Sequence, residues 1–381
     1  MKNMKNNFDA SKPNMKEFTS PDGEYHFIFN PGPNTYNLAI GDRMMCAGPG
    51  FFARWGRTTK EDPTLSFFGP ELLDISITGK CMNECAFCYR DSKPTGEHMP
   101  VEMFEGILRS LPETVCQIAI GGGEPTLHPE FTRILHLCKQ YGIVPNYTTN
   151  GIGSAVNDEI AYATKDCCGV VAVSWDRRDV EKTIQTLRYY IEIGCRKVNI
   201  HFVLGSHNIE YALNDLPKIL KKRVPELNAA LFLLYKPAGR AEYIQPPTTE
   251  QYSQLIQKFM HGVCKIGFDS CTVPFIVGLD FIDKISVEPC ESGRFSMFIN
   301  EHGVAYPCSF SEHSKNVGGM PVPLDDKQNF LGMWRYMVMM YGRKLKCTDE
   351  KCQHVSSCLG TCFLFDQFKC ELLHREVVEA L

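Results

Sequence analysis

The sequence predicts an α/β protein: a partial (β/α)6 barrel of TIM type on a parallel sheet, followed by a loop-rich C-terminal domain. Strand-like and helix-like segments alternate through residues 71–240, and the alternation stops after Arg240. The residues that follow carry many cysteines among Gly- and Pro-rich loops. Six β/α units fit a partial barrel better than the eight units of a complete one.

Each barrel unit is predicted from its own segment. The six expected strands are short and mostly apolar, and they span residues 72–78, 115–120, 143–148, 169–174, 197–203 and 229–235. Helical segments fall between them; in the first, which begins at Val101, apolar residues recur at the helical period, at Phe104, Ile107 and Leu108. Because parallel crossovers are right-handed, we expect the helices to cover the sheet.

The change in pattern along the chain also predicts the domain organisation. Residues 1–70 form an N-terminal extension of unassigned role, with an ordered part near residues 25–40. The barrel core covers residues 71–240, and a bridging region with a helix near residues 249–261 covers 241–285. Residues 286–381 form the second domain, which has little apolar periodicity and therefore needs something other than a large core to hold it together.

Bulk composition excludes several classes of protein. The 381 residues are 44% hydrophobic, enough for one large core and a smaller domain. The net charge of −4 predicts no nucleic-acid partner, and the absence of a long apolar run predicts no membrane span. No signal peptide is recognisable, so we expect a cytoplasmic protein. Because cytosolic thiols are kept reduced, we do not expect its 18 cysteines to form a disulfide framework, and some of them are candidate metal ligands.

Three cysteines follow the first predicted strand at x3 and x2 spacing, namely Cys81, Cys85 and Cys88. In parallel α/β domains the loops at the carboxyl ends of the strands form the active-site face. Three thiolates can each bind one iron of a [4Fe–4S] cluster, which leaves the fourth iron open. A zinc site would need a fourth close ligand, and none follows before His98.

This loop, with Phe87 before its last cysteine, resembles the Cys-x3-Cys-x2-Cys motif of the radical S-adenosylmethionine (SAM) superfamily. The resemblance covers residues 72–240. It implies a six-unit barrel, a [4Fe–4S] cluster on Cys81, Cys85 and Cys88, and SAM bound to the open iron through its amino and carboxylate groups. Reductive cleavage of SAM would give a 5′-deoxyadenosyl radical that abstracts hydrogen from a substrate.

A glycine-rich segment at the end of the second predicted strand extends the resemblance. Gly122, Gly123 and Glu124 match the family's Gly-Gly-Glu signature, which implies a contact with the methionyl amine of SAM. Glycine lets a backbone approach a ligand closely, and a carboxylate suits an ammonium group. Taken alone, the segment is more typical of a turn that ends a strand.

Further residues at the ends of the predicted strands are expected to lie on the same active-site face, at the carboxyl ends of the parallel strands. The resemblance implies that Ser174 and Asp176 meet the ribose and the methionyl carboxylate of SAM. Asn150, beside Thr149, is a further cofactor-binding candidate, and residues 236–240 resemble a turn found in many members. Each of these alone is as often structural as functional.

The C-terminal cysteines resemble the SPASM domain, which holds two auxiliary [4Fe–4S] clusters in many family members. The resemblance implies one cluster on Cys290, Cys308 and Cys362 and another on Cys347, Cys352, Cys358 and Cys370. The first set lacks a fourth ligand, for which Cys271 is the candidate; the alternatives are that Cys271 is simply buried and that the iron is open to substrate. The x4 spacing from Cys347 to Cys352 departs from the usual x2.

SPASM-bearing members mostly act on peptides or proteins, so the resemblance implies a maturase that makes an oxidative crosslink (thioether, C–C or C–O) in a ribosomally made peptide. The alternatives are a formylglycine-generating sulfatase maturase, an enzyme acting on a small molecule, and a non-catalytic zinc or Fe–S interaction protein. Sulfatase maturases carry an Asp after the cysteine matched to Cys308, where this chain has Ser309. Expected partners are a flavodoxin- or ferredoxin-type reductant and a separate leader-binding protein.

Overall fold

The structure is a computed structural model that describes residues 15–32, 34–40, 43–58, 60, 63–151, 157–283, 286–342, 347, 352–365, 368 and 370. Its centre is a sheet of strand order β12-β11-β10-β9-β8-β7-β6-β13-β14-β15. The first seven strands in this order are all parallel to their neighbours. This arrangement confirms the predicted α/β class and parallel sheet.

The six predicted strands lie close to their expected positions. They are β6 (Leu72–Ser76), β7 (Gln117–Gly121), β8 (Val144–Thr149), β9 (Val171–Ser174), β10 (Val198–Leu204) and β11 (Ala229–Leu234). A further parallel strand, β12 (Lys265–Phe268), extends the sheet beyond β11. Its four residues are exposed or only partly buried, so it lacks the apolar signal that marks the other strands.

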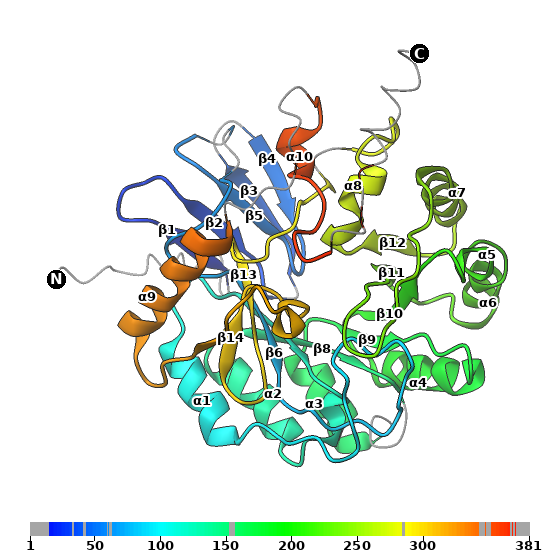
Figure 1. The fold of residues 1–381 in the computed structure, drawn as a ribbon, viewed down its shortest axis with the longest axis horizontal. Helices are drawn as coiled ribbons and strands as arrows, with labels where there is room; N and C mark the ends of the chain where they lie inside the picture. The colour runs from blue at the N-terminus through cyan, green and yellow to red at the C-terminus, as the bar shows by residue number, and fades with distance from the viewer. Residues whose placement is uncertain are drawn as a thin grey trace.

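Helices cover the outer side of these strands, as Figure 1 shows. They are α1 (Val101–Ser110), α2 (Phe131–Gln140), α3 (Asp158–Cys167), α4 (Val180–Ile193), α5 (Ile209–Asn214), α6 (Leu216–Arg223) and α7 (Thr249–Met260). Polar side chains fix several of their ends. Asn157 caps α3, and Thr248 with Gln251 forms a capping box on α7. Gly194, in the left-handed conformation, ends α4.

The C-terminal segment joins the same sheet. Strand β13 (Ser296–Ile299) pairs in parallel with β6, and the antiparallel strands β14 (Val304–Tyr306) and β15 (Met320–Pro321) follow. The short helix α8 (Val273–Ile276) precedes this segment. The segment itself also contains the helix α9 (Lys327–Met337), a π-helical turn over Val338–Gly342 and the short helix α10 (Val355–Cys358). The sheet therefore continues from the barrel core into the segment that bears the C-terminal cysteines.

The N-terminal residues form small antiparallel sheets. One contains β1 (Lys16–Thr19), β2 (His26–Phe29) and β5 (Phe52–Trp55), and β3 (Tyr36–Ile40) pairs with β4 (Arg43–Ala47) in a hairpin. The ordered part is thus longer than the predicted residues 25–40. Residues 1–14 of the predicted extension lie outside the described residues.

Arg54 of β5 ties this N-terminal sheet to the rest of the protein. Its Nη1 lies 2.8 Å from Glu71 Oε2 and 2.9 Å from Glu291 Oε1, and its guanidinium stacks 3.9 Å from the centre of the Phe295 ring. Glu71 precedes β6, whereas Glu291 and Phe295 precede β13. One buried cation therefore joins three parts of the chain.

Among the described segments, we find no helix with the length and apolar character needed to cross a bilayer.

Candidate functional site

Three cysteines lie on the loop that follows β6, at the carboxyl end of the parallel strands. Cys81, Cys85 and Cys88 are partly exposed. Cys81 N donates to Lys93 O at 3.0 Å, and Cys88 N donates to Cys85 O at 3.1 Å. Glu84, inside the loop, has a φ of 40°, a left-handed conformation that is costly for a residue with a side chain. The loop is therefore held in a specific, strained shape.

The turn after β11 clamps this loop from the far side of the sheet. Arg240 N donates to Cys88 O at 3.0 Å, and Arg240 Nε donates to Cys85 O at 3.2 Å. A Cβ atom on Gly239, whose φ is +61°, would lie only 2.4 Å from Tyr89 O. Only glycine fits there. Because β6 and β11 are separated by four strands in the sheet, this contact shows that the sheet curls around the cysteine loop.

The glycines that end β7 pack against the chain leading into the cysteine loop. A Cβ atom on Gly122, whose φ is +131°, would lie 2.2 Å from Thr78 O, and one on Gly123 would lie 2.2 Å from Lys80 O. Gly123 N also donates to Thr78 O at 2.6 Å. The close approach that the sequence predicted therefore includes the protein's own backbone, and it sets the position of Cys81.

Glu124 is buried beneath the site, with 1% of its surface exposed. Its Oε1 accepts hydrogen bonds from Thr126 Oγ1 at 2.6 Å and Thr149 Oγ1 at 2.8 Å, and its Oε2 accepts the Asn150 N–H at 2.7 Å. Burial raises the pKa of the carboxyl, and these hydrogen bonds oppose the shift. They position the loops after β7 and β8, and the contact of Glu124 with the methionyl amine of SAM stays a prediction.

Two side chains from neighbouring strand ends reach the cysteine sulfurs. Asn150 Nδ2 lies 3.8 Å from Cys81 Sγ, and Arg178 Nη2 lies 3.7 Å from Cys85 Sγ. Arg178 also donates to Asp176 from Nη2 at 2.6 Å, and this hydrogen bond holds the pKa of the Asp176 carboxyl below its usual value. The structure thus brings two predicted residues, Asn150 and Asp176, to the cysteine loop, and it adds Arg178, which the sequence argument missed.

Two other predicted residues lie nearby without a described link to this group. Ser174 is the last residue of β9 and pairs with His201 of β10. Phe87 projects from the cysteine loop with 45% of its surface exposed. Their roles remain predictions.

The distances between the three thiol sulfurs can be compared with those required by a single zinc ion and by an iron–sulfur cluster. Thiolates around one tetrahedral zinc ion lie about 3.8 Å apart, as Zn–S bonds of about 2.3 Å require. Within the described part of the chain, Cys81, Cys85 and Cys88 are not among the groups whose ligand atoms all lie within 4.8 Å of one another. At least one pair of these sulfurs is therefore farther apart than 4.8 Å, which is wider than the ligand spacing around one zinc ion and is compatible with a cluster of several iron atoms. Burial also raises the pKa of Cys81 and Cys85, so metal binding must displace their protons.

A second group of cysteines gathers where the barrel meets the C-terminal segment. The thiol of Cys271 is hydrogen-bonded to Cys362, and Cys290 and Cys308 both interact electrostatically with Cys271. Lys236, from the turn after β11, is 5% exposed and its charge acts on both Cys271 and Cys308. The structure therefore brings the candidate fourth ligand to the first predicted auxiliary set. Their function as ligands remains a prediction.

The second predicted auxiliary set also comes together. The thiol of Cys358 interacts electrostatically with three other cysteines, and burial raises its pKa to about 11. These three are Cys370, Cys347 and Cys352. The unusual spacing between Cys347 and Cys352 does not prevent the gathering. Metal binding by this set likewise remains a prediction.

A cavity of about 770 Å³ lies between the barrel strands and the first auxiliary set. Its lining includes Asp74, Ala119 and Lys236 from the barrel, and Cys271, Cys290 and Cys308 from the cysteine set. The cavity is large enough for a bound side chain and opens beside thiols that could hold a metal cluster.

One ionisable residue that lines this cavity, Asp74, comes from a strand of the central sheet. It lies in the middle of β6, and burial raises its pKa to about 6, against the opposing charge of Arg90 and a hydrogen bond from Ser309. Ser309 is also hydrogen-bonded to the partly buried Tyr89, which follows Cys88. Asp74 was not among the predicted site residues, although an aspartate inside the apolar segment LLDIS is a signal that could have revealed it.

Comparison with known protein families identifies one part of the chain. The family model of the Radical SAM superfamily matches residues 75–216. Among curated proteins, the chain is similar to the mycofactocin maturase MftC of Mycobacterium ulcerans, at 23% identity over 77% of this chain and 83% of that protein. It is also similar to a probable GTP 3′,8-cyclase of Methanocaldococcus jannaschii, at 31% identity over 40% of this chain and 56% of that protein.

Solved structures show a related fold. SuiB of Streptococcus suis bound to S-adenosylmethionine aligns with a TM-score of 0.62 at 17% identity, over 78% of this chain and 74% of SuiB. The SuiB complex with its precursor peptide SuiA aligns with a TM-score of 0.60 at 17% identity, over 78% of this chain and 72% of SuiB. The protein anSMEcpe with bound AdoMet aligns with a TM-score of 0.55 at 16% identity, over 76% of this chain and 89% of that chain.

Proposed function

Because residues 75–216 belong to the radical SAM superfamily, we propose that this protein is a radical SAM enzyme that modifies a peptide by oxidative bond formation. The observation that carries the proposal is the thiol loop of Cys81, Cys85 and Cys88, clamped by the turn at Arg240 at the carboxyl ends of the parallel strands. A cavity lined by Asp74, Ala119 and Lys236 of the barrel reaches a second group of thiols.

The first part of the proposal concerns the three thiols and the residues around them. Cys81, Cys85 and Cys88 would hold a [4Fe–4S] cluster, which with SAM supplies a carbon-centred radical when an external flavodoxin- or ferredoxin-type donor provides an electron. Asn150 and Arg178 donate toward the sulfurs of Cys81 and Cys85. Such hydrogen bonds stabilise thiolates and hold them in place.

The loops after β7 and β9 would form the SAM side of the site. Gly122 and Gly123 bring their backbone against the cysteine loop, and Glu124 holds Asn150 in position through its main-chain N–H. We assign Glu124 a positioning role in SAM binding, with contacts made by the backbone around it. Asp176 stays ionised through Arg178 and offers an acceptor for the ribose hydroxyls.

Asp74 would accept a proton during bond formation. When a carbon radical bonds to a substrate N–H, O–H or S–H group, that group must release one proton and one electron. The Asp74 carboxyl lines the cavity, and a pKa of about 6 suits proton uptake near neutral pH. The four thiols of Cys271, Cys290, Cys308 and Cys362 would hold the acceptor for the electron.

Similarity to peptide-modifying relatives favours a peptide over a small molecule. The match to the maturase MftC and the alignment with SuiB both extend well beyond residues 75–216, covering more than three quarters of this chain. The match to the GTP cyclase covers 40% of it. We therefore propose a ribosomally made peptide as substrate, presented either directly or by a separate leader-binding protein.

The direct test is SAM cleavage by anaerobically reconstituted protein. With dithionite, the wild type should release 5′-deoxyadenosine, and Cys85→Ala should not. Cys46→Ala, at an exposed thiol on the N-terminal hairpin, is the matched control and should behave as the wild type does. Three [4Fe–4S] clusters predict about twelve irons and as many sulfides per chain. Retained cleavage in Cys85→Ala, or zinc in place of iron and sulfide, would overturn the proposal.

A further inference from the structure

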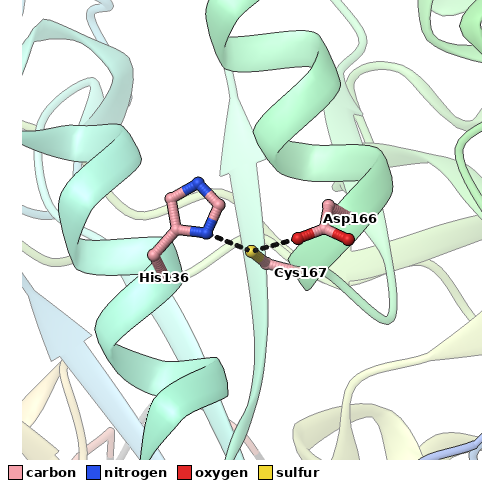
Figure 2. A group of neighbouring side chains, drawn as sticks. All are labelled: His136, Asp166 and Cys167. Carbon is pink, nitrogen blue, oxygen red and sulfur yellow. Dashed lines mark hydrogen bonds between the residues drawn. The ribbon is translucent and has the colours of Figure 1, made fainter.

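Three metal-binding side chains gather on the outer surface of the barrel, away from the cysteine loop. Figure 2 shows His136 from α2 facing Asp166 and Cys167 from the last turn of α3. Each offers one ligand atom, and these atoms all lie within 4.8 Å of one another. Among the described residues, this is the group of His, Cys, Asp or Glu side chains close enough to share one metal ion.

The donor spacing matches a tetrahedral ion. Cys167 Sγ lies 3.3 Å from His136 Nδ1 and 3.7 Å from an Asp166 carboxylate oxygen. Around tetrahedral zinc, with Zn–S of about 2.3 Å and Zn–N or Zn–O of about 2.0–2.1 Å, a sulfur lies about 3.5 Å from a nitrogen or oxygen ligand. The two separations from Cys167 Sγ are therefore already near those that the ion requires, and the His136 and Asp166 donors lie within 4.8 Å of each other.

The environment also fits a metal ion. His136 and Asp166 are exposed, so an ion can enter from solvent and keep a water molecule as its fourth ligand. Cys167 is buried to 9% exposure between the helices, which fixes one donor in place. A mixed set of imidazole, thiolate and carboxylate suits zinc, which accepts nitrogen, sulfur and oxygen ligands together.

A lysine side chain already forms an ion pair with one of the three proposed ligands, Asp166. Lys139 Nζ lies 2.7 Å from Asp166 Oδ2 and 3.2 Å from Asp166 O. It lies one helical turn after His136 on α2, so it stands beside the position that an ion would take. A bound divalent ion would have to displace this ammonium from the carboxylate, which makes Lys139 a competitor with a predictable effect on affinity.

We propose that His136, Asp166 and Cys167 form a zinc-binding site, with water as the fourth ligand, that joins α2 to α3 on the outside of the barrel. The site is independent of the iron–sulfur centres and of the proposed function. It would hold together two helices that flank β8, the strand that ends at Thr149 and leads to Asn150. A zinc ion there would stabilise the barrel wall and leave SAM cleavage unchanged.

The test uses anaerobically reconstituted protein, in which iron occupies the other cysteine sets, and Co²⁺ alone as the probe. One equivalent should produce a thiolate-to-cobalt absorption band, which Zn²⁺ abolishes. Cys167→Ser and His136→Ala should weaken binding by at least about 100-fold, since loss of even an outer partner costs about 10- to 100-fold. Cys195→Ser, at a half-buried thiol next to α4, is the matched control and should bind as the wild type does.

The variant Lys139→Ala should change cobalt affinity in the direction opposite to the ligand variants. Removing the competing ammonium should tighten cobalt binding about two- to fivefold, the value of an exposed ion pair, while lowering the metal-free melting temperature only slightly. Zinc should raise the melting temperature of the wild type but not of Cys167→Ser. An unchanged cobalt band in Cys167→Ser, or weaker binding in Lys139→Ala, would overturn the site.

Discussion

The backbone N–H of Asn150 donates to Oε2 of Glu124 at 2.7 Å, and the Asn150 side chain reaches Cys81 Sγ at 3.8 Å. A carboxylate that is 1% exposed is thereby linked to the thiol loop through one residue. The buried end of β7 and the end of β8 are set relative to each other by this carboxylate, and the geometry at Cys81 depends on it.

Replacement of Glu124 by alanine should destabilise the protein by about 3–5 kcal/mol, because it removes the buried acceptor of three hydrogen bonds, donated by Thr126, Thr149 and Asn150. Denaturant unfolding measures the change. Glu130→Ala is the control, since that carboxylate forms an exposed ion pair with Arg133 and should cost less than about 1 kcal/mol. Equal losses in the two variants would contradict a positioning role for Glu124.

Glycine 239 offers a test of the clamp on the cysteine loop. Gly239→Ala adds a Cβ atom 2.4 Å from Tyr89 O and should displace the loop, lowering the iron content and SAM cleavage after reconstitution. Gly262→Ala is the matched control. Its φ is +90°, but no atom lies within 4 Å of the added carbon, so it carries the backbone strain without the clash. If both variants load iron as the wild type does, the clamp is not needed for the site.

The raised pKa of the Asp74 carboxyl should make the free energy of unfolding depend on pH. Its pKa of about 6 in the folded protein lies above the ordinary value of 3.8, so folding favours the protonated form. The corresponding stability is fully present below pH 3.8 and is lost as the pH rises through 6, by up to about 3 kcal/mol. Asp74→Asn should remove this part of the dependence and be the more stable protein above pH 6. Unfolding free energies measured between pH 4 and 8 check it.

The same variant tests the proposed chemistry. Because proton transfer to Asp74 would follow hydrogen abstraction, Asp74→Asn should still release 5′-deoxyadenosine from SAM with dithionite. With a peptide substrate, it should consume SAM without forming the new bond. Loss of SAM cleavage in this variant would assign Asp74 to an earlier step, and full product formation would exclude it as the proton acceptor.

Arg54 anchors the N-terminal sheet. Arg54→Met should cost about 3–5 kcal/mol, because it leaves the buried Glu71 carboxylate without its cation. Burial already raises the pKa of Glu71 to about 7 with Arg54 in place. Arg57→Met, at an exposed ion pair with Glu24, should cost less than about 1 kcal/mol. Thermal unfolding and limited proteolysis compare the two variants, and similar melting temperatures would contradict the anchor.

Features that depend on a repeated pattern or on a fixed spacing of residues could be predicted from the sequence. The apolar stripe of the first helix and the Cys81 to Cys88 spacing are local signals, and the family match to residues 75–216 confirms the resemblance drawn from them. Strand β12 escaped prediction because it has only four residues and none of them is buried, which is too short and too weak an apolar signal to mark a strand. Strand β13 could not be assigned to the main sheet, because its partner β6 lies far earlier in the chain.

Contacts between distant residues explain the other differences. Nothing near Arg178 in the sequence indicates that its side chain reaches Cys85 Sγ, since the two meet only when the sheet curls. The glycines at 122 and 123 were expected to admit a ligand, because the sequence cannot tell a ligand from a neighbouring backbone. The resemblance to the SPASM domain did suggest which thiols gather, and Cys271 lies against Cys362 as the candidate for the missing position.

The pairing of β13 with β6 has a consequence for biosynthesis. Strand β6 leads directly into the cysteine loop, yet one of its two edges stays open until the ribosome has made the residues around 296–299. An unpaired edge is a template for aggregation. This edge is therefore open to mispairing from the synthesis of β6 until the synthesis of β13, and termination of translation within that interval should yield insoluble chains.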